Sequence, residues 1–382
     1  MKLVELRWTP YAVPFTAEFA TAHGGWRVRE GTIVRLRTDA GVTGIGEIAP
    51  LASHGTASLA ECLSALERIA TRLLGEDIDS LPVKLDALIG EGARYAPLRC
   101  GIETAALDAL ARAEDVSVAS LLSSHAARDV AVNALVDAAP CADASAAAER
   151  AVAYGFRDIK LKAGVARSMA EEVARVAAVR DAAGQHVRLR LDANGAWTEQ
   201  QAVATIRAIE PYDIDLVEQP VPPGDIAALR RVRAAVRIPI AADESVCGID
   251  TVRALIDARA VDAIVVKLPI AGGVRRGAES CELALAAGLG AIVTSALDCG
   301  IGVAAALQLA ATLPPASRGC GLATLALLED DLIVEELRIV DGRMEVPRAP
   351  GIGVTLDEVA LARYAAGPER VVRPDGRPSG RA

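Results

Sequence analysis

Hydrophobic and polar positions follow two different periods along the chain. Residues 1–50 alternate with a period of two, and the sequence DAG (39–41) separates two such runs, which predicts antiparallel strands joined by a hairpin. Residues 57–125 change to the spacing of amphipathic helices. Strands followed by helices predict a small α+β domain over residues 1–125.

From about residue 130, short apolar runs recur at intervals of mostly 20 to 32 residues, separated by Ala-rich amphipathic segments. This alternation predicts a parallel sheet, and eight repeats most simply close into a (β/α)₈-type barrel over residues 126–325. An open doubly wound sheet is the alternative, but no run of three glycines opens a helix after an early strand. The predicted barrel strands are 132–136, 158–162, 188–194, 215–220, 239–244, 263–268, 291–297 and 321–325.

The segment after the eighth predicted strand changes character again. Residues 326–365 contain two more apparent antiparallel strands, which we expect to return to the N-terminal domain and complete it. Residues 366–382 are polar and rich in Gly, Pro and Arg, which predicts a disordered tail. The predicted fold is therefore α/β, a (β/α)₈-type barrel with an N-terminal α+β capping domain completed by the C-terminal segment.

Composition and charge narrow the classes of function. The chain has 382 residues, 52% of them hydrophobic, which is enough for two domains with a sizeable core. The net charge is −9 and no dense Lys/Arg block occurs, which argues against a nucleic-acid partner. No apolar run reaches the roughly 18 residues of a membrane span, and the first residues lack a signal-peptide pattern, so we expect a cytoplasmic protein.

Five consecutive predicted strands carry charged residues at their carboxyl ends, where barrels hold their functional side chains. The last four of these positions are 26, 25 and 24 residues apart (192, 218, 243 and 267), which is one βα unit each time. We therefore expect them at a common height around the barrel mouth. The residues are Lys160 and Lys162, Asp192, Glu218, Asp243 and Lys267.

Three carboxylates that converge on one point repel one another unless a cation neutralises them. Oxygen ligands without His or Cys favour a hard ion, Mg²⁺ first and Mn²⁺ second. Flanking lysines can then act as bases, because neighbouring cations lower their pKa. The set predicts abstraction of a proton next to a carboxylate, through an enediolate with an ammonium group on each face.

Each of these residues has a simpler interpretation when taken alone. An acidic residue at a strand end, such as Asp192 or Asp243, often caps the following helix. A lone strand lysine often extends along the surface to water. Because five consecutive units repeat the pattern at the same place, a shared site is favoured over coincidence.

The motifs around these residues carry a resemblance to a known family. They are KLK (160–162), LDAN (191–194), VEQP (217–220), AADES (241–245) and VVKLPIAGG (265–273), and together they resemble the enolase superfamily, in its muconate-lactonizing-enzyme subgroup. GVTGIGEIAP (41–50) and GIETAALDAL (101–110) are similar to the capping domain of that family.

The resemblance implies a role for each residue of the set. Asp192, Glu218 and Asp243 would bind Mg²⁺. Lys162 would be the acid/base on one face of the substrate, tuned by Lys160. Lys267 would stand on the opposite face, as a second base or as electrostatic support.

Within the subgroup the chain is most similar to o-succinylbenzoate synthases, which dehydrate 2-succinyl-6-hydroxy-2,4-cyclohexadiene-1-carboxylate in menaquinone synthesis. None of the four histidines lies at a late strand end, so a mandelate-racemase-type His base is missing. The positions that match the charged pair of dipeptide epimerases are Gly321 and Ala323, which carry no charge. N-acylamino acid racemase or dipeptide epimerase, and muconate cycloisomerase, stay as alternatives. A non-catalytic binding protein on this fold is disfavoured, because no ligand or base of the set is missing.

A small carboxylate is thus the expected substrate, and the loops of the capping domain are expected to help select it. Arg190 shares the inward face of Asp192, with an ion pair to a barrel carboxylate as the alternative to substrate contact. Related proteins are often symmetric assemblies, so a homo-oligomer is the prior expectation. The candidate substrate contacts are Arg190, Asn194, His23, Trp26, His54, Ser295 and Asp298.

Overall fold

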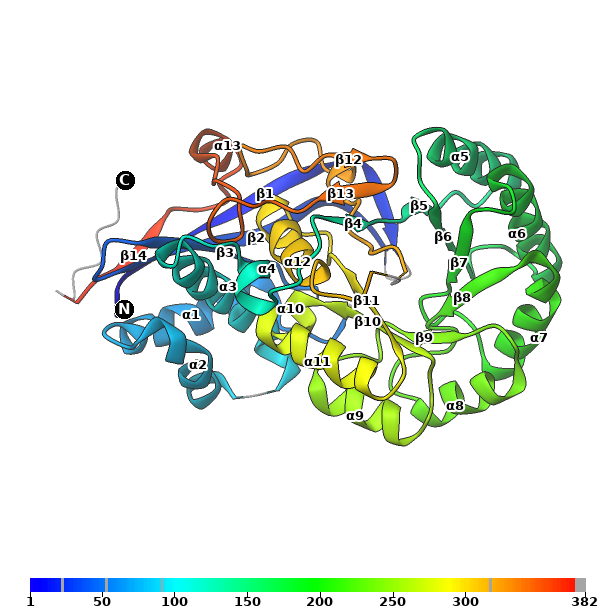
Figure 1. Ribbon diagram of the computed structural model, residues 1–382, viewed down its shortest axis with the longest axis horizontal. Coiled ribbons are helices and arrows are strands. Elements are labelled where there is room, and N and C mark those ends of the chain that lie inside the picture. Colours follow the sequence, from blue (N-terminus) through cyan, green and yellow to red (C-terminus); the bar gives the residue numbers. More distant parts are fainter. Residues whose placement is uncertain (22–23, 52–53, 91, 316–317, 375–382) are drawn as a thin grey trace.

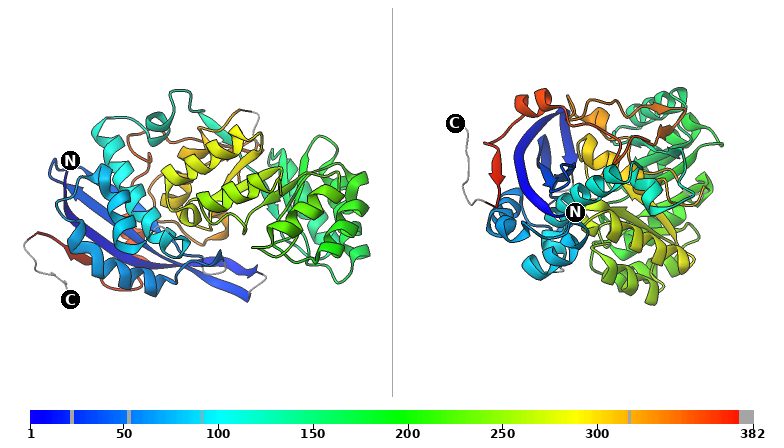
Figure 2. Two further views of the ribbon diagram at one scale, coloured as in Figure 1. Left: turned by 90° about the horizontal axis from the view of Figure 1, so that it is seen from below. Right: turned by 60° about the vertical axis from the view of Figure 1, so that its left-hand side comes forward.

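The described residues form two large sheets, one antiparallel and one parallel, and a small three-stranded antiparallel sheet (Figure 1). The structure is a computed structural model that describes residues 1–374 except 22–23, 52–53, 91 and 316–317. The antiparallel sheet lies at one end of the molecule, and the helices α5 to α8 of the parallel part lie at the other (Figure 2). The predicted α/β fold, a barrel with an N-terminal α+β cap, is confirmed.

The antiparallel sheet has the strand order β14-β1-β2-β3. Residues 39–42 form the predicted hairpin turn between β2 and β3, and Gly41 takes a positive φ of 78° there. Helices α1 and α2 cover a separate apolar core together with this sheet. The elements are β1 (Leu3–Thr21), β2 (Gly24–Thr38), β3 (Thr43–Ile48), α1 (Leu59–Leu73) and α2 (Leu81–Ile89).

Helix α3 (Ala96–Ala113) is buried along almost its whole length, because it packs against the antiparallel sheet and against the barrel. Its approach to β3 is close enough to require glycine. A Cβ atom at Gly44 or Gly46 would lie 2.0 Å from the carbonyl oxygen of Ala105 or Gly101, respectively. This explains Gly44 and Gly46 in the motif GVTGIGEIAP, and a Cβ atom at Gly101 in the second motif would likewise lie 2.4 Å from Ile48 Cγ1.

The parallel sheet has the order β11-β10-β9-β8-β7-β6-β5, and its strands curl around a barrel core. Its central strands read as continuous apolar runs because helices cover the outer face. The strands are β5 (Ala134–Val136), β6 (Asp158–Lys162), β7 (Arg188–Asp192), β8 (Ile214–Glu218), β9 (Ile240–Ala242), β10 (Ala263–Lys267) and β11 (Gly290–Thr294).

Helices follow the strands in the expected alternation, and side-chain caps begin several of them. Ser168, Thr198 and Asp225, for example, each accept a hydrogen bond from the first turn of the helix that follows. None of the helices in the described part of the chain is both long and apolar enough to cross a bilayer. The helices are α4 (Val118–Leu122), α5 (Cys141–Ala153), α6 (Met169–Ala183), α7 (Glu199–Ile209), α8 (Ile226–Ala235), α9 (Ile249–Asp257), α10 (Leu268–Ala271), α11 (Val274–Ala286), α12 (Gly300–Ala310) and α13 (Glu358–Arg363).

The eighth predicted strand, 321–325, is wrong in extent. Only Cys320 and Gly321 are extended, and they bridge Val132 on one side and Thr294 on the other, which closes the barrel. The contact with β11 is tight, since a Cβ atom at Gly321 would lie 2.1 Å from Thr294 Oγ1. The chain then turns into a short 3₁₀ helix at Leu325–Leu327, which ends the strand early.

The C-terminal segment 326–365 does contact the cap, because Leu328 and Ala365 bridge Phe15 and Tyr11 of β1, but its strands pair differently from the prediction. Strands β12 (Ile339–Val340) and β13 (Arg343–Glu345) are antiparallel as expected, but they pair with β4 (Asp129–Ala131) and not with the sheet of the cap. The sheet of the cap instead takes up β14 (Arg370–Val372), inside the stretch predicted to be a disordered tail. The apolar Val371 is buried there, and this burial outweighs the polar character of its neighbours.

Glu47, on β3, links the cap to the barrel through a buried carboxyl group. It accepts hydrogen bonds from the Tyr11 hydroxyl and from the backbone N–H groups of Cys299 and Gly302, at 2.9 and 2.8 Å, at the start of α12. Burial and the nearby carboxyl group of Asp298 raise the pKa of Glu47 from its usual 4.5 to about 8.

This raised pKa predicts that stability falls with rising pH. The folded protein retains a proton on Glu47 that the unfolded chain has lost, so the stabilisation is full below pH 4.5 and disappears as pH rises through about 8. Glu47→Gln should remove up to about 1.4 kcal/mol per pH unit of this slope. Urea unfolding between pH 5 and 9 measures it, and equal slopes in both proteins would contradict the assignment.

Candidate active site

The polar side chains at the carboxyl ends of the barrel strands lie in register. Lys162 on β6 is directly opposite Asp192 on β7, which in turn is opposite Glu218 on β8. Asp243 follows β9, and Lys267 ends β10. The two lysines therefore stand on opposite sides of the three carboxylates in the strand order of the sheet.

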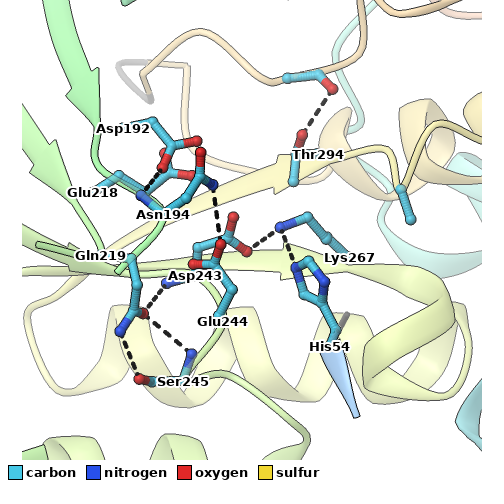
Figure 3. Close-up of polar contacts among 12 residues, drawn as sticks. His54, Asp192, Asn194, Glu218, Gln219, Asp243, Glu244, Ser245, Lys267 and Thr294 are labelled. Carbon is cyan, nitrogen blue, oxygen red and sulfur yellow. Dashed lines mark hydrogen bonds and ion pairs between the residues drawn. The ribbon is translucent and has the colours of Figure 1, made fainter. Parts of the chain in front are cut away.

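Asp192, Glu218 and Asp243 form one buried cluster (Figure 3). An oxygen atom from each lies within 4.8 Å of the others. The Lys160 ammonium lies among them, 2.6 Å from Asp192 Oδ2 and 2.8 Å from Glu218 Oε1. Lys267 forms an ion pair with Asp243 on the other side of the cluster.

The pKa values in the cluster reflect burial and charge acting together. Burial raises the pKa of Glu218 to about 7, and the negative charge of Asp192 adds to the effect. For Asp192, burial acts in the same direction, but the Lys160 ammonium outweighs it and lowers the pKa. Asp243 has a raised pKa because burial outweighs the attraction of Lys267.

Lys160 and Lys267, which pair with the carboxylates, have raised pKa values among the protein's own side chains. Burial opposes the charge of Lys160, but Asp192 and Glu218 outweigh it and raise its pKa. Asp243 and Glu244 do the same for Lys267. Among these side chains, carboxylates rather than cations are the nearest charged neighbours of the two ammonium groups. The prediction of a lowered pKa concerns lysines beside a bound cation, and it stays a prediction. A cation held by the same carboxylates would act in the opposite direction.

The donor set of this cluster fits a hard divalent cation. All three residues offer carboxylate oxygens, which are the ligands that Mg²⁺ prefers. Glu218 is completely buried, and its Oε2 atom has no hydrogen-bond partner among the described residues. A buried carboxylate oxygen without a partner is costly unless a cation contacts it.

Gln219 and Ser245 hold the cluster in shape, and the sequence did not reveal this role. Gln219 is buried with a φ of 38°, and its Oε1 atom accepts hydrogen bonds from the backbone N–H groups of Asp243 and Ser245, both at 3.1 Å (Figure 3). Its Nε2 atom donates to Ser245 Oγ at 2.9 Å. The only sequence signal was the position of both residues next to carboxylates, in VEQP and AADES.

A cavity of about 440 Å³ opens over the cluster. Four of the predicted substrate contacts line it, namely Trp26, His54, Asn194 and Ser295. His54 Nε2 lies 3.2 Å from the Lys267 ammonium, and Asn194 donates to Glu244 Oε1 at 3.0 Å (Figure 3). His23 lies outside the described residues.

Two other predicted substrate contacts point elsewhere. Arg190 is 4% exposed and does not line the cavity; its guanidinium donates to Gly319 O, at 2.8 Å, and to Asn133 Oδ1. It therefore ties the closing segment of the barrel to β7, and it forms no ion pair with a carboxylate of the described barrel residues. Asp298 is also buried away from the cavity and accepts from Ala296 N at 2.9 Å.

Comparisons with known proteins agree with this geometry. Residues 4–123 match the mandelate racemase / muconate lactonizing enzyme N-terminal domain, and residues 143–360 match the enolase C-terminal domain-like family. The chain is 30% identical over 360 residues to chloromuconate cycloisomerase CbnB of Cupriavidus necator, covering 93% of this chain and 95% of the relative. It is 40% identical over 236 residues to o-succinylbenzoate synthase of Thermobifida fusca (strain YX), covering 61% and 71%. The solved substrate-liganded complex of the L-Ala-D/L-Glu epimerase from Bacillus subtilis superposes with a TM-score of 0.86 at 28% identity, covering 93% and 99%.

The fold and the site together define one class of enzyme. Its members have a capped barrel whose mouth holds carboxylates between two lysines. The chain belongs to the enolase superfamily, in its muconate-lactonizing-enzyme subgroup. The three relatives named above have three different activities, so the particular reaction has to be inferred from the cavity.

Proposed function

We propose that this enzyme is an o-succinylbenzoate synthase, which dehydrates 2-succinyl-6-hydroxy-2,4-cyclohexadiene-1-carboxylate with Mg²⁺ bound by Asp192, Glu218 and Asp243. The observation that carries the proposal is the lining of the cavity. The charged side chains among its described lining residues all lie at the carboxyl ends of the barrel strands, and they are Lys160, Lys162, Asp192, Asp243, Glu244 and Lys267. The 40% identity to the Thermobifida fusca synthase supports the same reaction.

The rest of the lining suits a ring-bearing carboxylate. Apolar side chains such as Trp26, Leu51 and Leu135 form much of the wall. Gly321 and Ala323 line the cavity. The resemblance to dipeptide epimerases implies that these positions match the carboxylates that hold the substrate ammonium there, and neither residue offers a charge here. A substrate with a free α-amino group would therefore bury an unpaired cation here, which is costly.

In the proposed reaction Lys162 removes the proton from the ring carbon that carries the carboxylate. The ammonium so formed gives the proton to the hydroxyl group on the neighbouring carbon, and water leaves. One C–H and one C–O bond break, and the new C=C bond makes the ring aromatic. Lys267 holds a fixed positive charge on the other side of the cluster. When bound, Mg²⁺ would supply positive charge to the substrate carboxylate and so make the neighbouring C–H bond more acidic.

Removal of the metal is the first test. The purified protein should convert this substrate with Mg²⁺, and EDTA should lower turnover by at least about 1,000-fold, because metal stabilisation of the developing charge is worth several kcal/mol. Excess Mg²⁺ should restore the rate, measured as formation of the aromatic product by chromatography. A folded, Mg²⁺-loaded protein that forms no product would contradict the synthase. Turnover insensitive to EDTA would contradict the role of the metal.

Racemisation of an N-acylamino acid is the second candidate, because Lys162 and Lys267 stand on opposite sides of the cluster. Incubation of each enantiomer of an N-succinylamino acid in D₂O tests it. Racemisation predicts exchange of the α-proton in both, with Lys162→Ala and Lys267→Ala each abolishing exchange from one enantiomer. Muconate in the same assay tests cycloisomerisation, the activity in the name of the Cupriavidus necator relative.

A further inference from the structure

Arg29, on β2, is a buried arginine whose hydrogen bonds join two separate segments. Its Nε atom donates to Leu297 O at 3.0 Å, in the loop after β11. Its Nη1 atom donates to Pro50 O at 3.0 Å, in the segment after β3, and also to Glu30 O at 3.0 Å. The side chain is 4% exposed, so these contacts are removed from water.

Both segments that Arg29 joins form walls of the cavity. Leu297 lines the cavity itself, and so does Leu51, the neighbour of Pro50. Leu51 also packs with Ala296 and Ile270 in a small buried apolar cluster, against which Trp26 lies. Arg29 thus connects the part of this wall that the cap supplies, at Pro50 and Leu51, to the part that the barrel supplies, at Leu297.

Asp298 supports the arginine electrostatically. Its Oδ1 atom lies 3.9 Å from Arg29 Nη2, and neither atom has a hydrogen-bond partner among the described residues. Its Oδ2 atom accepts from the backbone N–H of Ala296 at 2.9 Å. The same carboxylate therefore balances the buried guanidinium and shapes the loop that carries Ala296 and Leu297.

The geometry points to Arg29 as a positioning residue that fixes the cap segment at Pro50–Leu51 against the barrel loop Ser295–Asp298, and so sets the apolar wall that receives the substrate. A guanidinium suits this task because its planar fork can donate to several carbonyl groups at once, whereas a lysine ammonium acts as a point charge on a flexible stem. The inference rests on the proposed function only for the choice of substrate in the kinetic test.

The chain offers a matched control in Arg180 on α6. It is 2% exposed and, within the described part of the chain, it likewise donates to backbone carbonyl groups, those of Tyr212, Gly184, Val187 and Asp213, at 2.7 to 2.9 Å. None of these residues lines the cavity. Arg29→Lys and Arg180→Lys therefore remove similar hydrogen bonds at different places.

The first readout is hydrogen exchange of the full chain with Mg²⁺, followed by mass spectrometry. Arg29→Lys should speed exchange at least about tenfold at the amides of Leu51 and Ala296, which donate to Thr56 Oγ1 and Asp298 Oδ2 in the intact wall. Arg180→Lys should leave these two amides unchanged. Unchanged exchange at both amides in Arg29→Lys would overturn the inference whatever the reaction proves to be.

The second readout is kinetic. Arg29→Lys should raise KM for the cyclohexadiene carboxylate at least about tenfold and lower kcat less, because a displaced wall weakens placement of the substrate while the lysines stay. Arg180→Lys should leave KM unchanged. An unchanged KM in Arg29→Lys would overturn the inference, whereas absence of turnover in the unmodified protein would overturn only the proposed reaction. If Arg29→Lys does not fold, Asp298→Asn should show the same two effects, and their absence there would equally overturn it.

Discussion

Replacing Lys162 by alanine is expected to lower kcat at least about 1,000-fold. The residue takes a proton and returns it in the proposed reaction, and general acid–base catalysis by one group contributes roughly 10²- to 10⁴-fold. The Mg²⁺ affinity should not fall. The Lys162 ammonium is one of the positive charges that act on Asp192, so its removal takes away a charge that repels the cation. Rapid-mixing kinetics and calorimetric titration with Mg²⁺ measure the two effects on the same sample.

A surface lysine supplies the control for this prediction. Lys84, on helix α2 of the cap, is half-exposed and does not belong to the barrel mouth. Its ammonium lies 2.7 Å from Glu76 Oε1. Lys84→Ala should keep full turnover. If Lys162→Ala kept more than about a tenth of the original kcat, Lys162 would not be the acid/base, and Lys267 would be the next candidate.

Replacing Glu218 by glutamine is expected to lower the Mg²⁺ affinity at least about 100-fold. Loss of a residue that only hydrogen-bonds to a metal ligand lowers metal affinity by up to about 100-fold, and loss of a ligand itself should lower it at least as much. The substitution keeps the shape of the side chain, but an amide carries no negative charge for a cation. Addition of Mg²⁺ at 100 times the original Kd should stabilise the unmodified protein by about 2.7 kcal/mol and the variant hardly at all. Thermal unfolding with and without Mg²⁺ measures the difference.

Asp215 provides the matched control on the same strand. It lies at the opposite end of β8 and forms an ion pair with Arg318 at 2.6 Å. Asp215→Asn should leave the Mg²⁺-dependent stabilisation intact. A Glu218→Gln variant that bound Mg²⁺ as tightly as the unmodified protein would rule out Glu218 as a ligand.

The sequence predicted those features that depend on period and spacing. Parallel strands linked by helices repeat at nearly constant intervals, so equal spacing along the chain became equal height in the barrel. For this reason Lys162, Asp192 and Glu218 stand in register, as their positions indicated. The glycines of the cap motifs likewise follow from a close approach that only glycine permits.

The features that escaped prediction depend on partners far away in the chain. Arg190 and Asp298 do lie next to the site, but carbonyl and guanidinium groups from distant segments turn their side chains away from the cavity. Gln219 holds two backbone N–H groups of another loop, through a positive φ that its sequence neighbours do not indicate. Spacing gives the height of a residue in the barrel, whereas the direction of its side chain is decided by tertiary contacts.

The pairing of β14 with β1 has a consequence for the synthesis of the protein. Leu6 pairs with Val372, which lies 366 positions later in the chain, so β1 leaves the ribosome well before its partner strand does. At the usual rate of 5 to 20 residues per second, roughly 20 to 70 s pass between the synthesis of β1 and that of β14. The whole barrel is synthesised in this interval, while the outer edge of β1 is still unpaired. During that time the nascent chain exposes unpaired backbone groups to other strands. The sheet of the cap can therefore be completed only after the barrel has been synthesised, although β1 itself is made before the barrel.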